Sequence, residues 1–243
     1  MIRYRCKKFF LDIEYIYFAE RIIKSNADIT RYYQCTEESL FNVKFTSPII
    51  DLRKNISEIE ANFRKSLRNE IKDASKNYKI DTNFHLDVRD DLISDFKDFY
   101  SFFSTKKSIP DADYLMLEKL KKNIIISYAK HEDKYIVWHL YLKNTKKLRL
   151  LYSASLLSEN KDDAKLIVRA NKMLHFEDIV LAKEKGFLVY DLGGVALNDQ
   201  SREGINKFKL GFTKDMSISN NFVVANTFLG KVLLLLSKIL GRN

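Results

Sequence analysis

Three apolar, extended stretches follow one another between residues 123 and 156, and they constrain the fold of this chain more than any other feature. The stretches read NIIISYAKH, KYIVWHLYLKN and KLRLLYSASL, and the short polar segments EDK and NTK join them. Connections this short join antiparallel neighbours, and β-branched and aromatic residues favour strands. The sequence therefore predicts an antiparallel meander over 123–156.

Segments with helical spacing lie on both sides of the meander. The predicted helices cover 57–74, 90–107, 111–122 and 162–186, and the predicted strands outside the meander cover 79–88 and 187–192. Ser57 and Glu60 have the spacing of a capping box at the start of the first helix. This order predicts an α+β fold in which helices flank a mixed, mostly antiparallel sheet.

The charge and the cysteine content indicate which partners and which cellular compartment suit the chain. The chain has 42 Lys and Arg residues against 32 Asp and Glu residues, a formal net charge of +10, so nucleic acid, anionic lipid or a phosphate-rich ligand is a plausible partner class. Cys6 and Cys35 form neither a metal spacing nor a disulfide framework, which favours a reducing cytoplasm and no metal. The first 20 residues lack an uninterrupted apolar core, so we expect no signal peptide.

The composition changes along the chain predict three parts. Residues 1–54 read as an N-terminal annex, 55–215 as the main domain, and 216–243 as an apolar C-terminal helix packed on that domain. Gly230 and Lys231 interrupt the tail, and its longest uncharged run is too short for a membrane span, which needs about 20 residues. Peripheral contact with the inner face of a membrane, with Lys238 and Arg242 near the headgroups, remains an alternative for the tail.

The stretch VYDLGGVALNDQSREGINKFKLGF, residues 189–212, concentrates glycine in a glycine-poor chain. It holds Gly193, Gly194, Gly204 and Gly211, and the whole chain has only 7 glycines. A strand that ends in Asp191 and Gly-Gly lets the backbone turn sharply and approach a ligand. With Asn206 and Lys209 nearby, this segment is compatible with a polar cluster around a small polar substrate. The bare pattern, a Gly-Gly turn with flanking lysines, is more often purely structural.

Three ordered segments resemble the Fem-type peptidoglycan aminoacyltransferases. YDLGG followed by GINKFKLGF is similar to the closing signature of that family, while FRKSLRNEIKDASKNY and RANKMLHFEDIVLAKEKG resemble two of its helices. The resemblance covers roughly residues 55–215. It implies the fold of the Gcn5-related N-acetyltransferase (GNAT) superfamily, which Fem proteins usually contain twice. This chain is too short for two copies, and Thr213 and Lys214 stand where the family has a second Gly-Gly.

A single copy of these motifs looks more like the small sugar N-acyltransferases found with O-antigen and capsule genes. That resemblance implies transfer of an acyl group, such as acetyl or 3-hydroxybutyryl, from acyl-CoA to the amine of a dTDP- or UDP-linked deoxyamino sugar. Two alternatives stay open: transfer from aminoacyl-tRNA to a cell-wall precursor, and a non-catalytic module that binds membrane or nucleic acid. A homodimer is also compatible with the sequence.

The resemblance implies a role for each candidate site residue. The expected catalytic residues are Asp191 and His139 as candidate bases and Lys209 as an electrostatic clamp, with His175 considered and assigned to structure. The expected acyl-CoA-binding residues are Arg169, Asn171, Lys172 and Ser153. The expected acceptor-binding residues are Arg68, Tyr190, Asn206 and Lys207.

The expected donor site lies at the start of the helix after the meander. The family's donor pyrophosphate binds at that helix N-terminus, where free N–H groups favour an anion. The glycine loop usual in the superfamily is missing, since LIVRANK supplies Arg169 without a glycine. We also expect an oxyanion donor near Ser153–Ser155.

Overall fold

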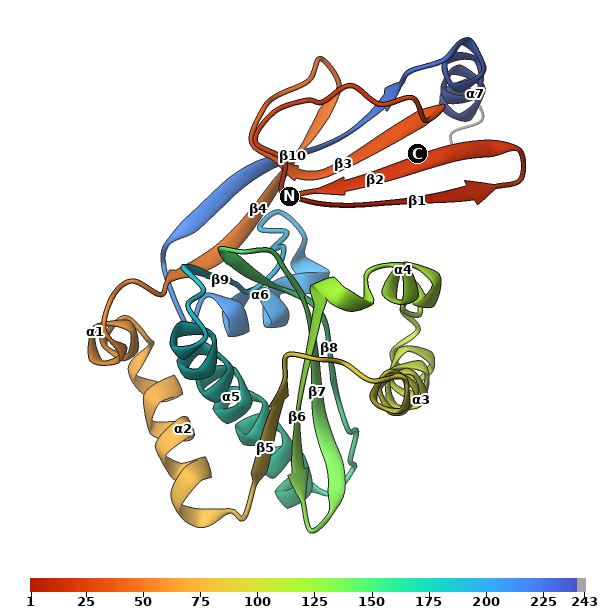
Figure 1. The fold of residues 1–243 in the computed structure, drawn as a ribbon. Helices are drawn as coiled ribbons and strands as arrows, with labels where there is room; N and C mark the ends of the chain where they lie inside the picture. Colours follow the sequence, from red (N-terminus) through yellow and green to blue (C-terminus); the bar gives the residue numbers. More distant parts are fainter. Residues whose placement is uncertain (240–243) are drawn as a thin grey trace. The chain divides into compact units, whose positions relative to one another are not determined.

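The computed structural model describes residues 1–239, which divide into two compact units (Figure 1). Unit 2 is Ser47–Met216, and unit 1 combines Met1–Thr46 with the residues from Ser217 onward. Residues 47–54, expected in the N-terminal annex, belong by their contacts to unit 2, because Ile49–Asp51 pair with strand β9 (Val189–Asp191).

Unit 2 is built on a mixed sheet. Its strands follow the spatial order β4 (Asn42–Asp51), β9, β8 (Lys147–Ser155), β7 (Lys134–Lys143), β6 (Ile124–His131) and β5 (Asp81–His85). β5 to β8 are antiparallel neighbours, β8 and β9 run parallel, and β4 is antiparallel to β9. The predicted meander is therefore confirmed as β6, β7 and β8.

Helices cover the unit 2 sheet from two sides (Figure 1). They are α1 (Ile56–Ala61), α2 (Lys65–Asn77), α3 (Asp90–Lys107), α4 (Tyr114–Lys119), α5 (Lys161–Glu184) and α6 (Glu203–Lys209), with short 3₁₀ turns at Lys121–Asn123 and Gln200–Arg202. α2 packs on α5, which covers β5 to β8, while α3 packs on β8 from the opposite side. The meander strands are therefore enclosed between helices.

The expected first helix is wrong in two respects. It is two helices, because the chain leaves the helical path after Ala61 and α2 starts at Lys65. The capping box also lies two residues earlier than expected: the Asn55 side chain accepts from the Glu58 N–H at 2.9 Å, and Glu58 Oε2 accepts from the Asn55 N–H at 3.0 Å. Asn55 satisfies one of the free amides in the first turn of α1, so Ser57 lies inside the helix.

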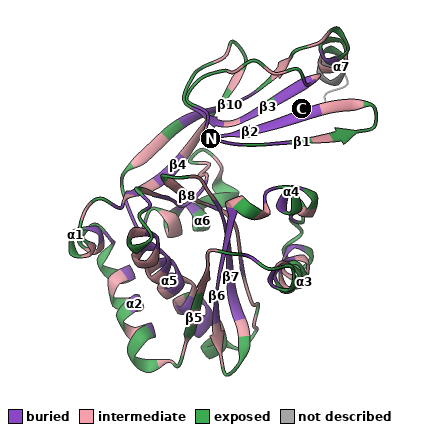
Figure 2. Ribbon diagram, viewed as in Figure 1, coloured by how far each residue is buried: buried purple, intermediate pink, exposed green. Residues whose placement is uncertain are grey.

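The core explains why the meander reads as nearly continuous apolar sequence. β6 and β7 are buried along most of their length (Figure 2). On one side Ile125 and Tyr141 join a large cluster with Phe63, Phe212 and residues of α5. On the other side Trp138 packs against aromatic rings of α3 such as Phe96. Strands that are covered on both faces lose the alternation of a half-exposed strand.

Unit 1 is a smaller sheet with one helix. It contains β1 (Ile2–Lys8), β2 (Leu11–Tyr17), β3 (Ile29–Cys35), most of β10 (Met216–Ala225) and the helix α7 (Phe228–Ile239). β1 and β2 form an antiparallel hairpin, β2 and β3 are parallel, and β3 is antiparallel to β10.

The C-terminal segment differs from the expected single helix over 216–243. Residues 216–225 form strand β10, and the helix α7 starts only at Phe228. The expected headgroup contacts fall outside the description, since Arg242 and the side chain of Lys238 are beyond it. Within residues 1–239 no helix is both long and apolar enough to cross a bilayer.

Candidate active site

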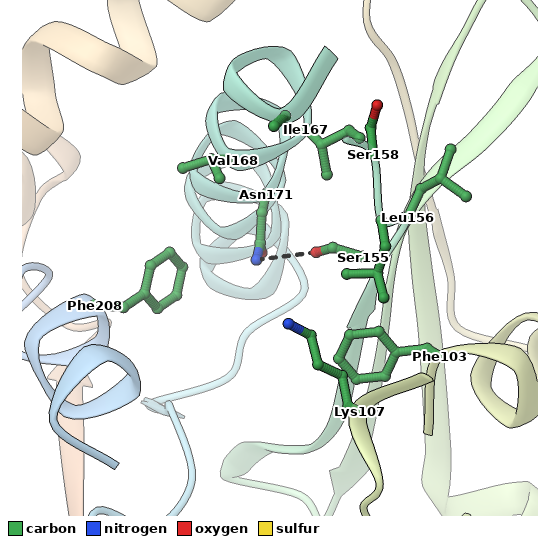
Figure 3. A pocket seen from close by; sticks show the side chains of 11 residues that line it. Phe103, Lys107, Ser155, Leu156, Ser158, Ile167, Val168, Asn171 and Phe208 are labelled. Carbon is green, nitrogen blue, oxygen red and sulfur yellow. Dashed lines mark hydrogen bonds between the residues drawn. The ribbon is translucent and has the colours of Figure 1, made fainter. Parts of the chain in front are cut away.

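A cavity of about 290 Å³ lies in unit 2 beside the C-terminal half of β8. β8 pairs with β9 only at Lys147–Arg149, since β9 ends at Asp191 while β8 continues to Ser155. The cavity is bounded by the end of β8, the first turns of α5, the C-terminal part of α3 and Phe208 of α6 (Figure 3). The sheet thus opens at a strand end, a preferred place for a ligand site in α/β sheets.

The cavity wall is mainly apolar, with a few polar groups on one side. Its lining residues are Phe103, Lys107, Ser155, Leu156, Leu157, Ser158, Ala164, Ile167, Val168, Asn171 and Phe208. Asn171 Nδ2 donates to Ser155 Oγ at 3.4 Å, and Figure 3 shows this contact across the cavity wall. Lys107 alone among these lining residues is charged.

A buried polar network stands behind Asn171. His139 Nε2 lies 2.9 Å from Asn171 Oδ1, and His139 Nδ1 lies 2.9 Å from Asp178 Oδ2. The same Asp178 oxygen accepts from Ser127 Oγ at 2.7 Å and from Tyr141 OH at 2.5 Å. His139 and Asp178 are 0 % exposed, so no water replaces these contacts. The network fixes the Asn171 side chain from behind.

The network continues to a second histidine. Tyr141 OH lies 2.8 Å from Tyr190 OH, which lies 2.7 Å from His175 Nδ1. Burial is the main cause, and the negative charge of Asp178 the second, that raises the pKa of Tyr141 and of Tyr190 well above the usual range. Both hydroxyls therefore keep their protons. Burial is the main cause that holds the pKa of His175 well below its usual range, and the charges of His139 and Lys209 add to the effect. The His175 ring is therefore neutral.

Donor counting sets the direction of these hydrogen bonds. Tyr141 donates its one proton to Asp178, so it must accept from Tyr190. Tyr190 has then spent its proton, and His175 must carry its own proton on Nδ1 and donate to Tyr190. His175 Nε2 is left as a buried acceptor without a partner. The whole series of donors therefore points toward the carboxylate of Asp178.

The glycine-rich segment forms a tight loop beside β8. Asp191 is buried, and its Oδ1 accepts from the Gly193 N–H at 2.8 Å, while Lys147 Nζ lies 3.5 Å from Asp191 Oδ2. Lys209 Nζ donates to the carbonyl oxygen of Gly194 at 2.8 Å. Two of the three predicted catalytic residues, Asp191 and Lys209, thus hold the loop, and neither is among the residues that line the cavity.

Burial perturbs Lys209 strongly. It lowers the pKa of the amine from its ordinary 10.5 to about 8, with Arg149 adding to the effect and Asp191 opposing it. Between pH 8 and 10.5 the unfolded chain therefore holds more protons at this residue than the folded chain. By linkage, the folded state gains stability from this group as the pH rises through that interval.

We expect Lys209→Met to remove this pH dependence. The free energy of unfolding of the wild type, measured by urea titration and compared with that of the variant, should rise between pH 8 and 10.5. Lys207→Met is the matched control, because Lys207 is on the same helix with its side chain 68 % exposed. A constant difference between wild type and Lys209→Met across that interval would show that Lys209 titrates normally.

The expected donor-binding residues divide between two places. Asn171 lines the cavity, whereas Ser153 lies opposite His139 in the β7–β8 pairing and is not a lining residue. Arg169 and Lys172 turn toward α2: Arg169 pairs with Asp73 at 2.6 Å, and Lys172 pairs with Glu70 at 2.6 Å. These two ion pairs tie α5 to α2.

The start of α5 also differs from expectation. The helix begins at Lys161, so residues 168–172 lie well inside it and not at its N-terminus. Asn160 Oδ1 accepts from the N–H groups of Asp162 and Asp163 at 2.8 and 3.2 Å. Two carboxylates in the first turn and an occupied cap disfavour a pyrophosphate at this position.

The expected acceptor-binding residues mostly hold the fold. Tyr190 is fully buried in the polar network. Asn206 is buried, and its side chain makes two hydrogen bonds with the backbone of Ala196. Nδ2 donates to the Ala196 carbonyl oxygen at 2.8 Å, and Oδ1 accepts from the Ala196 N–H at 3.3 Å. Arg68 donates to the carbonyl oxygen of Ala61 at the end of α1, and Lys207 pairs with Glu203 on the surface of α6.

Sequence reasoning missed Asp178 and Tyr141, although a signal was present. Asn171, His175 and Asp178 are spaced by four and then three residues, which places them on one face of α5. His139 and Tyr141 alternate on one face of β7. No group of three or more potential metal ligands occurs among the described residues.

Solved structures share this fold, whereas neither a protein-family model nor a curated protein matches the chain. FemX superposes with a TM-score of 0.57 at 15% identity, covering 79% of this chain and 63% of the FemX chain. The C-terminal domain of a putative lysylphosphatidylglycerol synthetase from Agrobacterium fabrum gives 0.58 at 11% identity, covering 87% and 72% of the two chains. L-PGS from Bacillus licheniformis gives 0.55 at 14% identity, covering 88% and 74%.

At these low sequence identities the similarity shows a shared fold only. The chain spans less than two thirds of the length of the FemX structure. The TM-scores above 0.5 show that this chain and these structures share a fold. The expected α+β fold, in which helices flank a mixed and mostly antiparallel sheet, is therefore confirmed.

Proposed function

We propose that the chain is an N-acyltransferase whose reacting carbonyl lies in the cavity beside Asn171 and Ser155. The observation that carries this proposal is the way the polar network holds Asn171. On the cavity side, Asn171 Nδ2 donates to Ser155 Oγ at 3.4 Å. On the buried side, Asn171 Oδ1 lies 2.9 Å from His139 Nε2. Donors that are fixed before the reaction need no reorganisation when charge develops on an oxygen.

The chemistry assigns each group a separate task. A neutral amine attacks the carbonyl carbon of the activated acyl group, and the carbonyl oxygen becomes an oxyanion that Asn171 Nδ2 and the Ser155 hydroxyl stabilise. The leaving group departs when the carbonyl re-forms, and the amine proton passes to water. His139 does not contact the acyl group, since Asn171 stands between them; it is a positioning residue that holds the amide.

The cavity favours a small acyl group that carries no positive charge. About 290 Å³ is at the lower end of ligand pockets, and Phe103, Ile167 and Phe208 give it apolar walls. Of the residues that line it, Lys107 carries the one charge, so an ammonium on the acyl group would find no carboxylate partner there. These features support a small acyl group such as acetyl or 3-hydroxybutyryl. We propose acyl-CoA as its donor and the amine of a nucleotide-linked amino sugar as its acceptor.

A second candidate, transfer from aminoacyl-tRNA, is favoured by the start of α5. Its cap is filled by Asn160, and Asp162 and Asp163 repel the pyrophosphate that an acyl-CoA would bring to this place. The chain also carries a net charge of +10, which suits tRNA. The name of one structural neighbour, a putative lysylphosphatidylglycerol synthetase, agrees with an aminoacyl group as the group that is transferred.

The test compares both donors directly. We expect purified protein, given acyl-CoAs and dTDP- or UDP-amino sugars, to release thiol and to yield a sugar product heavier by one acyl group. Asn171→Asp keeps an acceptor for His139 but loses the donor to the oxyanion, and should lower kcat by about 10²-fold. Asn198→Asp, the same substitution at an exposed residue that does not line the cavity, is the control.

Other outcomes separate the candidates. Labelled amino acid transferred from charged tRNA, without turnover of any acyl-CoA, would establish the second candidate. No transfer from either donor by well-folded protein would overturn the assignment as an acyltransferase. Equal activity of Asn171→Asp and wild type would remove Asn171 from the reaction.

A further inference from the structure

Two phenylalanines at the turn between β1 and β2 stand in solvent. Phe9 is 98 % exposed and Phe10 is 68 % exposed, and both follow directly on Lys7 and Lys8. Phe9 has a φ of 56°, a left-handed conformation that is uncommon for a residue other than glycine. Single exposed apolar residues are ordinary, but two adjacent aromatic rings at a turn are not explained by packing within unit 1.

The start of α7 belongs to the same end of unit 1. Asp28, just before β3, accepts from the Asp12 N–H at 3.0 Å through Oδ2 and from Thr227 Oγ1 at 2.7 Å through Oδ1. Asp12 lies two residues after Phe10, and Thr227 immediately precedes α7. Gly230 allows this approach, since a Cβ there would lie 2.2 Å from the Asp28 carbonyl oxygen.

The outward side of α7 is apolar instead of polar. Phe228, Val232 and Leu235 are 83 %, 37 % and 61 % exposed, and their spacing of four and three residues places them in one stripe. Leu229 and Leu236 widen the stripe, with exposures of 40 % and 46 %. A helix on the surface of a globular domain normally turns its apolar stripe to the core, whereas this stripe leaves apolar side chains exposed.

We propose that the apolar end of unit 1, meaning Phe9, Phe10 and the exposed stripe of α7, docks on the surface of an anionic lipid bilayer. Charge complementarity selects this occupant: Lys7 and Lys8 adjoin the rings of the turn, and Lys231 lies on α7. Aromatic and aliphatic side chains enter the headgroup boundary, while lysine amines reach anionic headgroups. The docking is independent of the acyl transfer proposed above.

Unit 1 supplies its own matched control. Leu40 and Phe41 form a second exposed apolar pair, 95 % and 75 % exposed, but they follow Glu37 and Glu38. This pair comes after β3 ends at Cys35, whereas Asp28 stands before β3 begins, so it lies at the opposite end of that strand. Acidic neighbours disfavour an anionic surface at equal apolar content.

The experiment is co-sedimentation of the full chain with vesicles of phosphatidylcholine alone or mixed equally with phosphatidylglycerol. We expect binding to the mixed vesicles that weakens with added salt. Phe9→Ser with Phe10→Ser should lower the vesicle affinity by about tenfold or more, since burying one such ring is worth at least that factor. Leu40→Ser with Phe41→Ser should leave the affinity unchanged. Equal melting temperatures would confirm that both double variants fold.

A second measurement reports the contact itself. Phe9→Trp should shift its fluorescence to shorter wavelength when mixed vesicles are added, whereas Trp138 is fully buried and should stay constant. No binding, or equal losses in both double variants, would overturn the proposal. A concentration-dependent dimer that the Phe9 and Phe10 substitutions abolish would also overturn it, because the face would then join two copies of the chain.

Discussion

Replacing Asp178 with alanine is expected to lower the free energy of unfolding by about 3–5 kcal/mol and to abolish acyl transfer. Ser127, His139 and Tyr141 all direct a polar atom at Asp178 Oδ2, at 2.5–2.9 Å. Removing the carboxylate leaves these buried groups without their acceptor, and each loss costs about 1–3 kcal/mol. Asn171 would lose its fixed position as well, because His139 holds it.

Urea unfolding, followed by circular dichroism, measures the first effect, and the acyl-transfer assay measures the second. Glu184→Ala is the control: Glu184 lies on the same helix but is exposed, and its loss should stay within about 0.5 kcal/mol. Asp178→Asn should fall between the two, because an amide retains one acceptor oxygen. Similar losses for Asp178→Ala and Glu184→Ala would show that the network contributes little to stability.

Gly193→Ala is expected to cost about 2–4 kcal/mol, from backbone strain and a steric clash together. Gly193 has a φ of 77°, which costs an L-residue about 1–2 kcal/mol. An added Cβ would also lie 2.8 Å from the Leu150 carbonyl oxygen and 3.4 Å from Lys209 Nζ. The backbone of β8 cannot yield easily, so the loop would move and the contact of Lys209 with Gly194 would weaken.

Two other glycines separate these causes. Gly186 has a φ of 83° and nothing within 4 Å of its added Cβ, so Gly186→Ala should show the backbone cost alone. Gly204 lies in α6 without a positive φ and with open space, so Gly204→Ala should stabilise the helix by about 0.5–1 kcal/mol. Urea unfolding of the three variants gives the comparison. Equal costs at Gly193 and Gly186 would mean that the close approach to Leu150 is unimportant.

The local patterns of the sequence predict the frame of unit 2 well. The meander, α3 and α5 follow from apolar periodicity and short connections, because each depends on residues close in sequence. The start of α1 was misjudged because Asn55 and Ser57 are both good caps, and only the backbone decides between them. The β10 segment needed β3 as its partner, which no local pattern reveals.

The candidate site was harder to predict because its residues gain their meaning from distant partners. The sequence points to Asn171, His139 and Tyr190 separately. His139 contacts Asn171 directly, but its connection to Tyr190 runs through Asp178 and Tyr141 on two different elements. Asp191, Lys209 and Asn206 looked like substrate ligands because they are polar residues in a glycine-rich loop. Their side chains instead satisfy the backbone of that loop, a need that becomes visible only in three dimensions.

The division of the chain into units sets an order for its folding during synthesis. Unit 2 is continuous in sequence, so it can fold as soon as residues 47–216 have left the ribosome. Unit 1 must wait, because β3 obtains its partner β10 only after residues 216–225 have been synthesised; the Gln34 N–H then donates to Asn221 Oδ1 across 187 residues. Until then the edge of β3 that faces away from β2 has no strand beside it. A chain truncated after residue 216 would therefore keep an open strand edge that can pair with a neighbouring chain and aggregate.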